Sequence, residues 1–256
     1  MIFDTHAHYD DSRFDGDREA VLTSLSFHKV TRVVNVAADM ESVRTTLELA
    51  DDYGFIYAAI GVHPDGVAEM TEEDLETLKA LSAHPKVVAI GECGLDYYGR
   101  EIPRETQIFW FERQLLLAKE LDLPVIVHSR EAAEDTLETV KRSYTGDRAG
   151  IIHCFSYGKE MAKAFLDLGY YIALGGVVTF KNSRKAKEVA AYVPEDRLLV
   201  ETDCPYLAPV PLRGTRNFSG NLPYVLDTLA EIRGVDREKL EQATYENACR
   251  LYRLKE

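Results

Sequence analysis

The chain lacks the features that would place it in a membrane, in a secretory pathway or among small metal-binding modules. Its four cysteines, Cys93, Cys154, Cys204 and Cys249, form no Cys-x-x-Cys pair, which excludes a zinc ribbon and a thioredoxin-type motif and indicates reduced thiols. No apolar run approaches the roughly 18 residues that cross a bilayer. Residues 1–6 carry neither the basic nor the apolar region of a secretory signal. We therefore expect a cytoplasmic protein that makes no membrane contact.

Positive charge is also scarce. The 256 residues include 30 Lys and Arg against 43 Asp and Glu, giving a net charge of −13. A broad electropositive surface is therefore excluded, and the field of the whole molecule repels a polyanion. If the protein acts on nucleic acid, it must hold phosphate at a local site, for example through metal ions.

What is present is a regular alternation of short β-branched segments with longer amphipathic ones. The segments predicted as strands are residues 1–6, 31–37, 55–61, 86–92, 123–128, 149–153, 169–175 and 197–203. Helices are predicted over residues 17–28, 40–53, 72–81, 103–121, 132–143, 159–168, 184–192, 223–233 and 237–254. Eight such units at this length predict one α/β domain, residues 1–256, with the (β/α)8 TIM-barrel fold. A doubly wound sheet is the rival, but His6-Ala7-His8 stands where that fold has a glycine-rich loop.

Residues that bind metals follow or end most of the predicted strands. They are His6 and His8 at the first strand, His63 after the third, Glu92 at the fourth, His128 at the fifth, His153 at the sixth and Asp203 at the eighth. The carboxyl ends of barrel strands meet at one mouth, so these side chains are expected to form one metal centre. A single histidine at a strand end is more often an ordinary polar residue, but this shared placement is improbable without a common site.

The predicted donor set is too large for one tetrahedral ion. Four imidazoles and two carboxylates suit two divalent ions bridged by a carboxylate, and Glu92 is the natural bridge. The mixed nitrogen and oxygen donors are compatible with Zn, Mn, Fe or Mg. Such a centre suits hydrolysis of a phosphodiester, an amide or a lactone, with Asp203 accepting the proton of the attacking water.

Two further acids precede the predicted ligands by two residues. Asp4 and Glu201 share the strand parity of His6 and Asp203, so both are predicted to point into the barrel beneath the metals. Because buried acids need partners, we expect them to orient ligand imidazoles; the alternative is a local hydrogen bond to backbone.

Six motifs in order resemble those of the TatD-type metal-dependent deoxyribonucleases, which belong to the amidohydrolase superfamily. The motifs are residues 3–8 (FDTHAH), 61–64 (GVHP), 91–97 (GECGLDY), 124–130 (PVIVHSR), 153–156 (HCFS) and 201–209 (ETDCPYLAP), and the resemblance extends to residues 246–248. It implies a TIM barrel that hydrolyses DNA with two divalent metals (Mg, Mn or Zn), often as a 3′ to 5′ exonuclease on single strands.

The resemblance also implies roles for individual residues. His6, His8, Glu92 and Asp203 would hold one metal, and Glu92, His128 and His153 the second, with Asp203 as general base. His63 and Asp96 would line the substrate side, and Arg130 follows the fifth-strand ligand as in the family. This chain has Glu92 at its fourth strand and no lysine closing a strand, which weakens the relatives that bridge their metals with a carboxylated lysine.

Two departures from the family pattern concern the expected mouth. Tyr157 stands where the family usually has glycine, and Phe218 begins a replacement of the usual Glu-Pro. Next to Phe218 and Tyr206, Arg213 and Arg216 are predicted to receive a phosphate and a stacked base; the alternative is a solvated loop with surface arginines.

Three functional hypotheses remain at this point. The first is a metal-dependent exonuclease on single-stranded DNA, which needs no obligate protein partner and is expected to be a monomer. The second is a metal-dependent hydrolase of a small amide, lactone or phosphoester in the same superfamily. The third is a non-catalytic barrel, whose signature would be a lost metal ligand; none is lost in this sequence.

Overall fold

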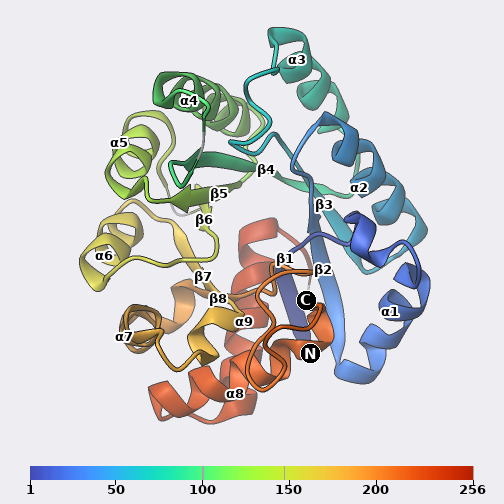
Figure 1. Ribbon diagram of the computed structural model, residues 1–256, viewed down its shortest axis with the longest axis vertical. Helices are drawn as coiled ribbons and strands as arrows, with labels where there is room; N and C mark the ends of the chain where they lie inside the picture. Colours follow the sequence, from blue (N-terminus) through green and yellow to red (C-terminus); the bar gives the residue numbers. More distant parts are fainter. Residues whose placement is uncertain (100, 147, 256) are drawn as a thin grey trace.

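A ring of eight parallel strands surrounded by helices forms the frame of the protein (Figure 1). The computed structural model describes residues 1–99, 101–146 and 148–255. The strands are β1 (Ile2–Ala7), β2 (Val30–Val36), β3 (Ile56–Ile60), β4 (Val87–Asp96), β5 (Val125–Arg130), β6 (Gly150–Ile152), β7 (Tyr171–Leu174) and β8 (Leu198–Val200). Each strand pairs with the next in sequence order, and a bridge between Ala7 and Cys204 joins the first strand to the segment after the last. The predicted (β/α)8 barrel is confirmed.

The helices follow the strands in the predicted order. They are α1 (Arg18–Ser24), α2 (Met40–Asp52), α3 (Glu72–Leu81), α4 (Arg104–Glu120), α5 (Ala133–Ser143), α6 (Lys159–Asp167), α7 (Arg184–Tyr192), α8 (Leu222–Arg233) and α9 (Arg237–Tyr252). The segment predicted as one helix over residues 17–28 is divided, because a 3₁₀ turn, η2 (Leu25–His28), follows α1. None of the helices within the described ranges is both long and apolar enough to cross a membrane.

Local side-chain chemistry fixes where several helices begin. The Asp39 carboxylate accepts a hydrogen bond from the Ser42 amide at the start of α2, and Thr71 and Asp74 form a reciprocal capping box at the start of α3. Such caps satisfy amide groups that have no partner inside the helix. The loops after β2 and β3 therefore end at defined positions, close to the mouth of the barrel.

Two apolar layers hold the barrel together. Side chains that point inward, among them Phe3, Ile126 and Leu199, form one buried cluster, and the opposite faces of the strands pack beneath the helices. Helix α9 contributes Tyr245 and Tyr252, whose rings lie 6.1 and 5.8 Å from that of Phe3. This packing fills the amino end of the barrel, as the interior of such barrels requires.

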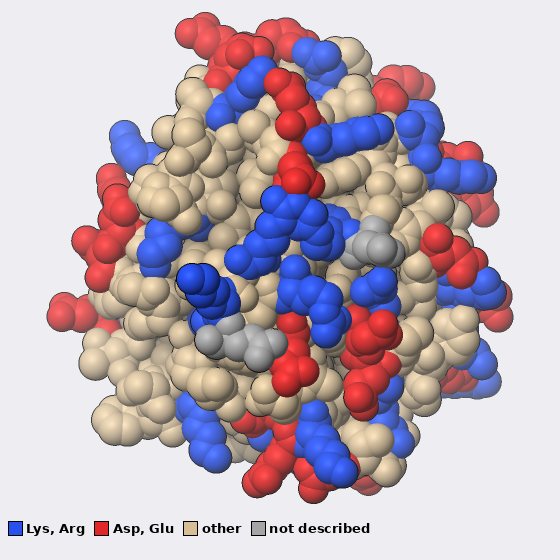
Figure 2. All heavy atoms as spheres, turned by 180° about the vertical axis from the view of Figure 1, so that it is seen from behind, with Lys and Arg blue, Asp and Glu red and all other residues tan. Residues whose placement is uncertain are grey.

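Charge is unevenly distributed over the surface. Figure 2 shows Lys and Arg side chains gathered near the middle of the face seen from behind, with acidic side chains around them. At the amino ends of the strands, Arg148 and Arg253 both pair with Asp122, and Arg32 donates to the backbone oxygen of Lys255. The cations at this end therefore fasten the C-terminal segment to the barrel.

Candidate metal centre

The first two predicted ligands come from the end of β1. The Nε2 atoms of His6 and His8 lie 3.0 Å apart, and the Nδ1 atom of His8 lies 2.7 Å from the Val36 carbonyl oxygen. A carbonyl accepts only, so the proton of a neutral His8 sits on Nδ1 and leaves the Nε2 lone pair available to a metal. The backbone of β2 thus sets the tautomer of a ligand on β1.

Asp203 lies on the segment that follows β8, next to β1, and its side chain approaches the same two histidines. Its Oδ1 atom lies 3.7 Å from His6 Nε2 and 3.4 Å from His8 Nε2. The Asp203 amide donates to the His6 carbonyl over 3.0 Å, which fixes the two strand ends relative to each other. Asp203 has a φ of 54°, a left-handed conformation that aspartate adopts more readily than most residues. This turn points its carboxylate at the mouth.

Glu92 lies at the centre of the cluster and faces a different set of histidines with each oxygen. Its Oε2 atom lies 3.3 Å from His6 Nε2 and 3.6 Å from His8 Nε2. Its Oε1 atom lies 2.8 Å from His153 Nε2 and 2.9 Å from His128 Nδ1. The carboxylate therefore stands between two groups of nitrogen donors, in the position of a bridging ligand.

Glycines beside Glu92 let β4 approach β5 closely. A Cβ atom on Gly94 would lie 2.0 Å from the His128 carbonyl oxygen, and one on Gly91 would lie 2.6 Å from the Ile126 carbonyl oxygen. Both glycines have positive φ angles, 146° and 138°. Only glycine fits such positions, because any side chain would push the two strands apart.

Charge within the cluster shifts the ionisation of the acids. Burial opposes ionisation of Glu92, but the nearby histidines, His153 and His6 foremost, outweigh it and hold the pKa of Glu92 well below its usual value. Burial likewise opposes ionisation of Asp203, and contact with His8 lowers its pKa overall. Both carboxylates are therefore negative at neutral pH.

The histidines divide into two types. Burial lowers the pKa of His6 to about 4 and that of His63 to about 3, so both are neutral donors. Burial also acts to lower the pKa of His8 and His128, but contacts with the carboxylates outweigh it and raise these values to about 10 and about 9. In the metal-free protein, protons on these two rings balance the negative carboxylates, a role that a bound cation takes over.

The donor set fits metal ions. Three groups of side chains place one ligand atom each within 4.8 Å of one another: His6 with His8 and Asp203, His63 with Glu92 and His128, and His6 with His153 and Glu201. Neutral imidazole nitrogens and carboxylate oxygens are the ligands of hydrolytic metal sites. All six predicted ligands therefore lie together at the mouth of the barrel.

Two residues predicted to line the substrate side lie against the ligands themselves. Asp96 is buried, and its Oδ2 atom lies 3.1 Å from His128 Nε2, so it holds the ring that faces Glu92. His63 Nε2 lies 3.7 Å from Glu92 Oε1, while its Nδ1 atom accepts a hydrogen bond from the Asp65 amide. His63 thus belongs with the potential ligands by position.

The cluster forms the floor of a cavity of about 360 Å³ at the mouth of the barrel. The residues that line it include six acids, four histidines, Tyr206, Ala38 and Arg130. Among the described residues, Arg130 is the single Lys or Arg in this lining. An anionic substrate would meet Arg130 and whatever cations the histidines and carboxylates hold.

The other two predicted arginines lie away from this cavity. The Nη1 and Nη2 atoms of Arg216 lie 2.8 and 2.6 Å from the two carboxylate oxygens of Asp17, and Arg213 lies 4.4 Å above the Phe180 ring. Neither residue lines the cavity. A pairing between positions 17 and 216 is invisible in the sequence, because nothing local connects them.

The two departures from the family pattern also lie outside the cavity lining. The Tyr157 hydroxyl lies 2.9 Å from Ser129 Oγ and accepts a hydrogen bond from the Ala132 amide, so it joins the loops after β5 and β6. The Phe218 ring packs edge-on against His28, 5.3 Å away. Both residues therefore pack against loops and do not face the cavity.

The two acids expected beneath the metals behave differently. Glu201 faces the interior: its Oε1 atom accepts a hydrogen bond from the Cys154 amide and lies 3.8 Å from His153 Nδ1. Asp4 contacts no ligand imidazole, and the alternative applies: its carboxylate accepts hydrogen bonds from the amides of His6 and Thr202 and from the hydroxyls of Thr202 and Ser219. The cause is an irregular register between Asp4 and Ala7, which breaks the strict alternation of β1.

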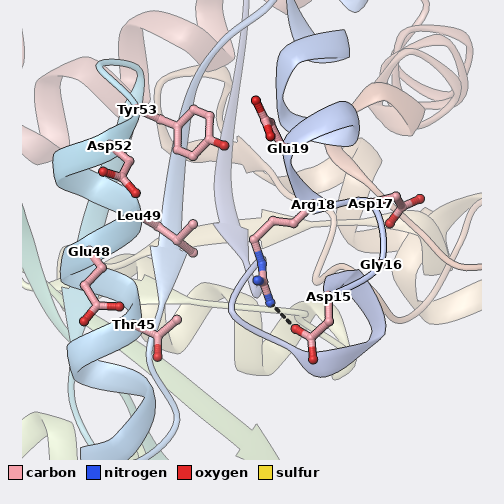
Figure 3. A pocket seen from close by; sticks show the side chains of 10 residues that line it. All are labelled: Asp15, Gly16, Asp17, Arg18, Glu19, Thr45, Glu48, Leu49, Asp52 and Tyr53. Atoms are coloured by element: carbon pink, nitrogen blue, oxygen red, sulfur yellow. Dashed lines mark hydrogen bonds and ion pairs between the residues drawn. The ribbon is translucent and has the colours of Figure 1, made fainter.

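A second hollow, of about 430 Å³, lies between α1 and α2 and is separate from the candidate ligands (Figure 3). Arg18 reaches into it and pairs with Asp15, as the dashed line in Figure 3 shows. The same guanidinium donates to the Tyr9 carbonyl over 2.6 Å and to that of Asp10 over 3.3 Å. Arg18 thus holds the segment that follows His8, a role that the sequence motifs do not indicate.

Comparison with known proteins gives a consistent result. The model of the family described as TatD related DNase matches residues 3–253. The chain is 45% identical to the uncharacterized metal-dependent hydrolase YabD of Bacillus subtilis, over 99% of this chain and 100% of that protein. It is 37% identical to the uncharacterized metal-dependent hydrolase YcfH of Escherichia coli, over 99% and 96%. The crystal structure of the TatD homolog YJJV of Escherichia coli superposes with a TM-score of 0.93 at 35% identity, covering 99% of this chain and 98% of the other.

Proposed function

The chain belongs to the TatD related DNase family of metal-dependent hydrolases, and from that premise we propose that it hydrolyses phosphodiester bonds in single-stranded DNA. We propose further that it removes nucleotides from the 3′ end. Membership of the family shows that the protein is a metal-dependent hydrolase, and the arrangement of the site supports the phosphodiester as the bond that it cleaves.

The observation that carries the proposal is the position of Glu92. Its two oxygens face two groups of histidines, His6 with His8 and His128 with His153, so one carboxylate can bridge two divalent ions. When bound there, a pair of such ions, Mg, Mn or Zn, would supply Lewis acidity at the phosphoryl oxygen, a water of lowered pKa, and stabilisation of the leaving oxygen. This combination suits phosphodiester cleavage, because negative charge builds up on the phosphate oxygens as the bond breaks.

Asp203 is the proposed general base. Its carboxylate is ionised, lines the cavity and is 18% exposed, while Oδ1 faces His6 and His8. An ionised carboxylate at the edge of the cavity can accept the proton of a water that attacks phosphorus. Asp96 supports the site by holding the His128 ring in place.

Arg130 is the proposed contact for a substrate phosphate. It is the one Lys or Arg among the described residues of the cavity lining. In this proposal it takes the place that the sequence patterns suggested for Arg213 and Arg216, and His63 stands between the ligands and the substrate. Because the net charge of −13 repels a polyanion, long duplex DNA should bind weakly.

The test is digestion of a 5′-labelled single-stranded DNA oligomer by metal-stripped protein resupplied separately with Mg, Mn and Zn. We expect a ladder of shortened labelled products with at least one ion, and none from Asp203→Asn. A 3′-labelled copy of the oligomer checks the polarity, since a 3′ exonuclease releases that label first. Absence of cleavage with every ion, by protein that has bound the metal, would contradict the proposal.

A second candidate is a hydrolase of small phosphoesters, amides or lactones. It is favoured by the size of the cavity, about 360 Å³, and by the six acids in its lining, which suit a small ligand better than a long polyanion. A panel of small esters and amides run beside the oligomer separates the two. Turnover of a small substrate together with intact DNA would favour this alternative.

A further inference from the structure

Two exposed tyrosines stand on opposite rims of the mouth. Tyr98 follows β4 and is 53% exposed, and Tyr206 follows β8 and is 45% exposed. The order of strands around the ring, β1 to β8, places the end of β4 across the barrel from the end of β8. The candidate metal ligands lie between them. Tyr206 lines the cavity, and Tyr98 adjoins it through Arg130, which lines the cavity and lies over the Tyr98 ring. Exposed large aromatic side chains in such positions are typical of ligand contacts.

Tyr206 is held in a fixed orientation. Its hydroxyl donates to Asp11 Oδ2 over 3.2 Å, and the Arg13 guanidinium lies 4.0 Å above its ring. Arg13 in turn pairs with Asp11 at 3.0 Å, so one carboxylate anchors both partners. The ring lines the cavity and lies near His8, with 6.4 Å between ring centroids. The Tyr206 ring therefore presents a flat surface at the rim and has less rotational freedom than an ordinary surface tyrosine.

Tyr98 has a similar arrangement on the opposite rim. The Arg130 guanidinium lies 4.0 Å from the centre of its ring, and the Tyr98 amide donates to Asp96 Oδ1 over 2.9 Å. The two rims differ in charge. Arg13 is neutralised by Asp11, whereas no carboxylate within the described ranges pairs with Arg130. The Tyr98 rim therefore combines an aromatic surface with a positive charge available to an anion.

We propose that Tyr98 and Tyr206 each stack on one base of a single-stranded nucleic acid, one on either side of the phosphate to be cleaved, and that Arg130 binds the next phosphate on the Tyr98 side. This inference rests on the proposed function and specifies how the substrate lies. Stacking on aromatic rings is how proteins hold single strands without reading their sequence.

The direction of the strand follows from the chemistry of the step. Asp203 takes a proton from water, the water oxygen forms a bond to phosphorus, and the bond from phosphorus to the 3′ oxygen breaks. The 3′ oxygen leaves with the electron pair and receives a proton from water. In an in-line displacement the leaving oxygen departs opposite the attacking one, and Asp203 is on the β8 side. The 3′ oxygen of the shortened strand therefore departs toward Tyr98 and Arg130, and we assign the base of the released nucleotide to Tyr206, the other exposed ring at the mouth.

The experiment compares three 5′-labelled oligomers of one sequence: an intact one, one with an abasic 3′-terminal nucleotide and one with an abasic penultimate nucleotide. Each is digested by the wild type, Tyr98→Ala and Tyr206→Ala, with Tyr192→Ala on α7 as a control for loss of an exposed tyrosine. Tyr98→Ala should raise KM for the intact oligomer about tenfold, as loss of one stacked base does. On the oligomer with the penultimate abasic site, where the base that Tyr98 would stack on is missing, Tyr98→Ala should have nearly the same KM as the wild type.

Tyr206→Ala should likewise raise KM for the intact oligomer and leave KM nearly unchanged for the oligomer with the terminal abasic site. Tyr98→Phe, which keeps the ring, should retain the wild-type KM. Replacing Arg130 by Met should raise KM and reduce the salt dependence of binding by about 0.7 in the log–log slope. Equal KM values for the three oligomers, in wild type and variants alike, would overturn the inference while the nuclease function stands.

Binding keeps the inference testable if cleavage fails. Fluorescence anisotropy of the same oligomers with Asp203→Asn measures the affinity without turnover. If the wild type cuts no DNA, the proposed function falls, and anisotropy decides the stacking alone. The inference is supported if both abasic oligomers bind more weakly than the intact one, if Tyr98→Ala removes the difference for the penultimate abasic site, and if Tyr206→Ala removes it for the terminal one. Equal binding of all three oligomers rejects it.

Discussion

The two ends of the barrel are built from the same strands but differ in what their side chains do. At the amino end, Phe3 packs on Tyr245 and Tyr252 in a dry apolar cluster. At the carboxyl end, the residues in line with this cluster are histidines and carboxylates around Glu92. One end stabilises the fold by burying apolar surface, and the other holds buried charges that are costly without a partner.

The backbone differs in the same way. The carboxyl end contains the irregular register of β1, the close approach at Gly94, and the left-handed residues Cys154 and Asp203. Strands with regular alternation would not direct all of these side chains to one point. The irregular backbone at the carboxyl end is what brings the candidate ligands together. The candidate site at the carboxyl end is therefore separable from the apolar cluster at the amino end, and a change at one end should leave the other largely intact.

Replacing Glu92 by Gln should break the site without breaking the fold. Glutamine keeps the shape but removes the charge that faces both groups of histidines, so we expect activity to fall by on the order of 10³-fold, comparable to other losses of electrostatic stabilisation. Metal content measured by elemental analysis should fall as well. Circular dichroism should match the wild type, since the amino-end cluster is untouched. Substantial activity in this variant would refute the assignment of Glu92 as the bridge.

Replacing Phe3 by Ala should do the reverse. The ring is fully buried against Tyr57, Tyr245 and Tyr252, and its loss should reduce the free energy of unfolding by about 3–5 kcal/mol. Urea denaturation at 25 °C measures this change. The folded fraction should bind metal with wild-type stoichiometry. A loss of metal affinity as large as in Glu92→Gln would show that the two ends are coupled.

The pair Glu201 and Asp4 sharpens the comparison within the mouth. Glu201 lies beside His153, so Glu201→Gln should weaken metal binding by about 10- to 100-fold, the usual effect of losing a partner of a ligand histidine. Asp4→Asn is the matched control, since that carboxylate contacts backbone amides and hydroxyl groups but no imidazole, so the change should lower stability rather than metal affinity. Titration against a competing chelator gives both affinities. Equal metal affinities in the two variants would contradict the distinct role of Glu201.

Much of this architecture is predictable from the sequence, because strand ends in a parallel barrel share one mouth. The alternation of segments gives the barrel, and the positions of His6, His128 and Asp203 at strand ends give the metal centre. Both follow from local pattern combined with a general rule of the fold.

What the sequence does not reveal depends on contacts between distant segments. The pairing of Arg216 with Asp17 and the packing of Phe218 on His28 join positions about two hundred residues apart in sequence, so neither leaves a local pattern. The orientation of Asp4 depends on a strand irregularity that alternation cannot anticipate. The role of Arg18 in holding the segment after His8 is likewise hidden, because its partners there are the backbone carbonyls of Tyr9 and Asp10.

The smallest expected effect is a pH dependence confined to the mouth. Burial tends to lower the pKa of His8 and His128, but the adjacent carboxylates raise these values to about 10 and about 9 in the metal-free protein. Both exceed the ordinary value near 6.5, so the folded protein binds more protons than the unfolded chain between these limits. Their contribution to stability is complete below about pH 6.5 and is lost as the pH rises through 9 and 10.

Glu201 acts in the same direction, because burial raises its pKa to about 8. The Tm of metal-free protein should therefore fall between pH 6.5 and 9.5. Metal-loaded protein should show a weaker fall, since the bound cation replaces the protons on His8 and His128. Calorimetry with and without a chelator measures both curves. Parallel curves would mean that these histidines do not exchange protons for metal, and the difference between the two ends of the barrel would then not extend to their response to pH.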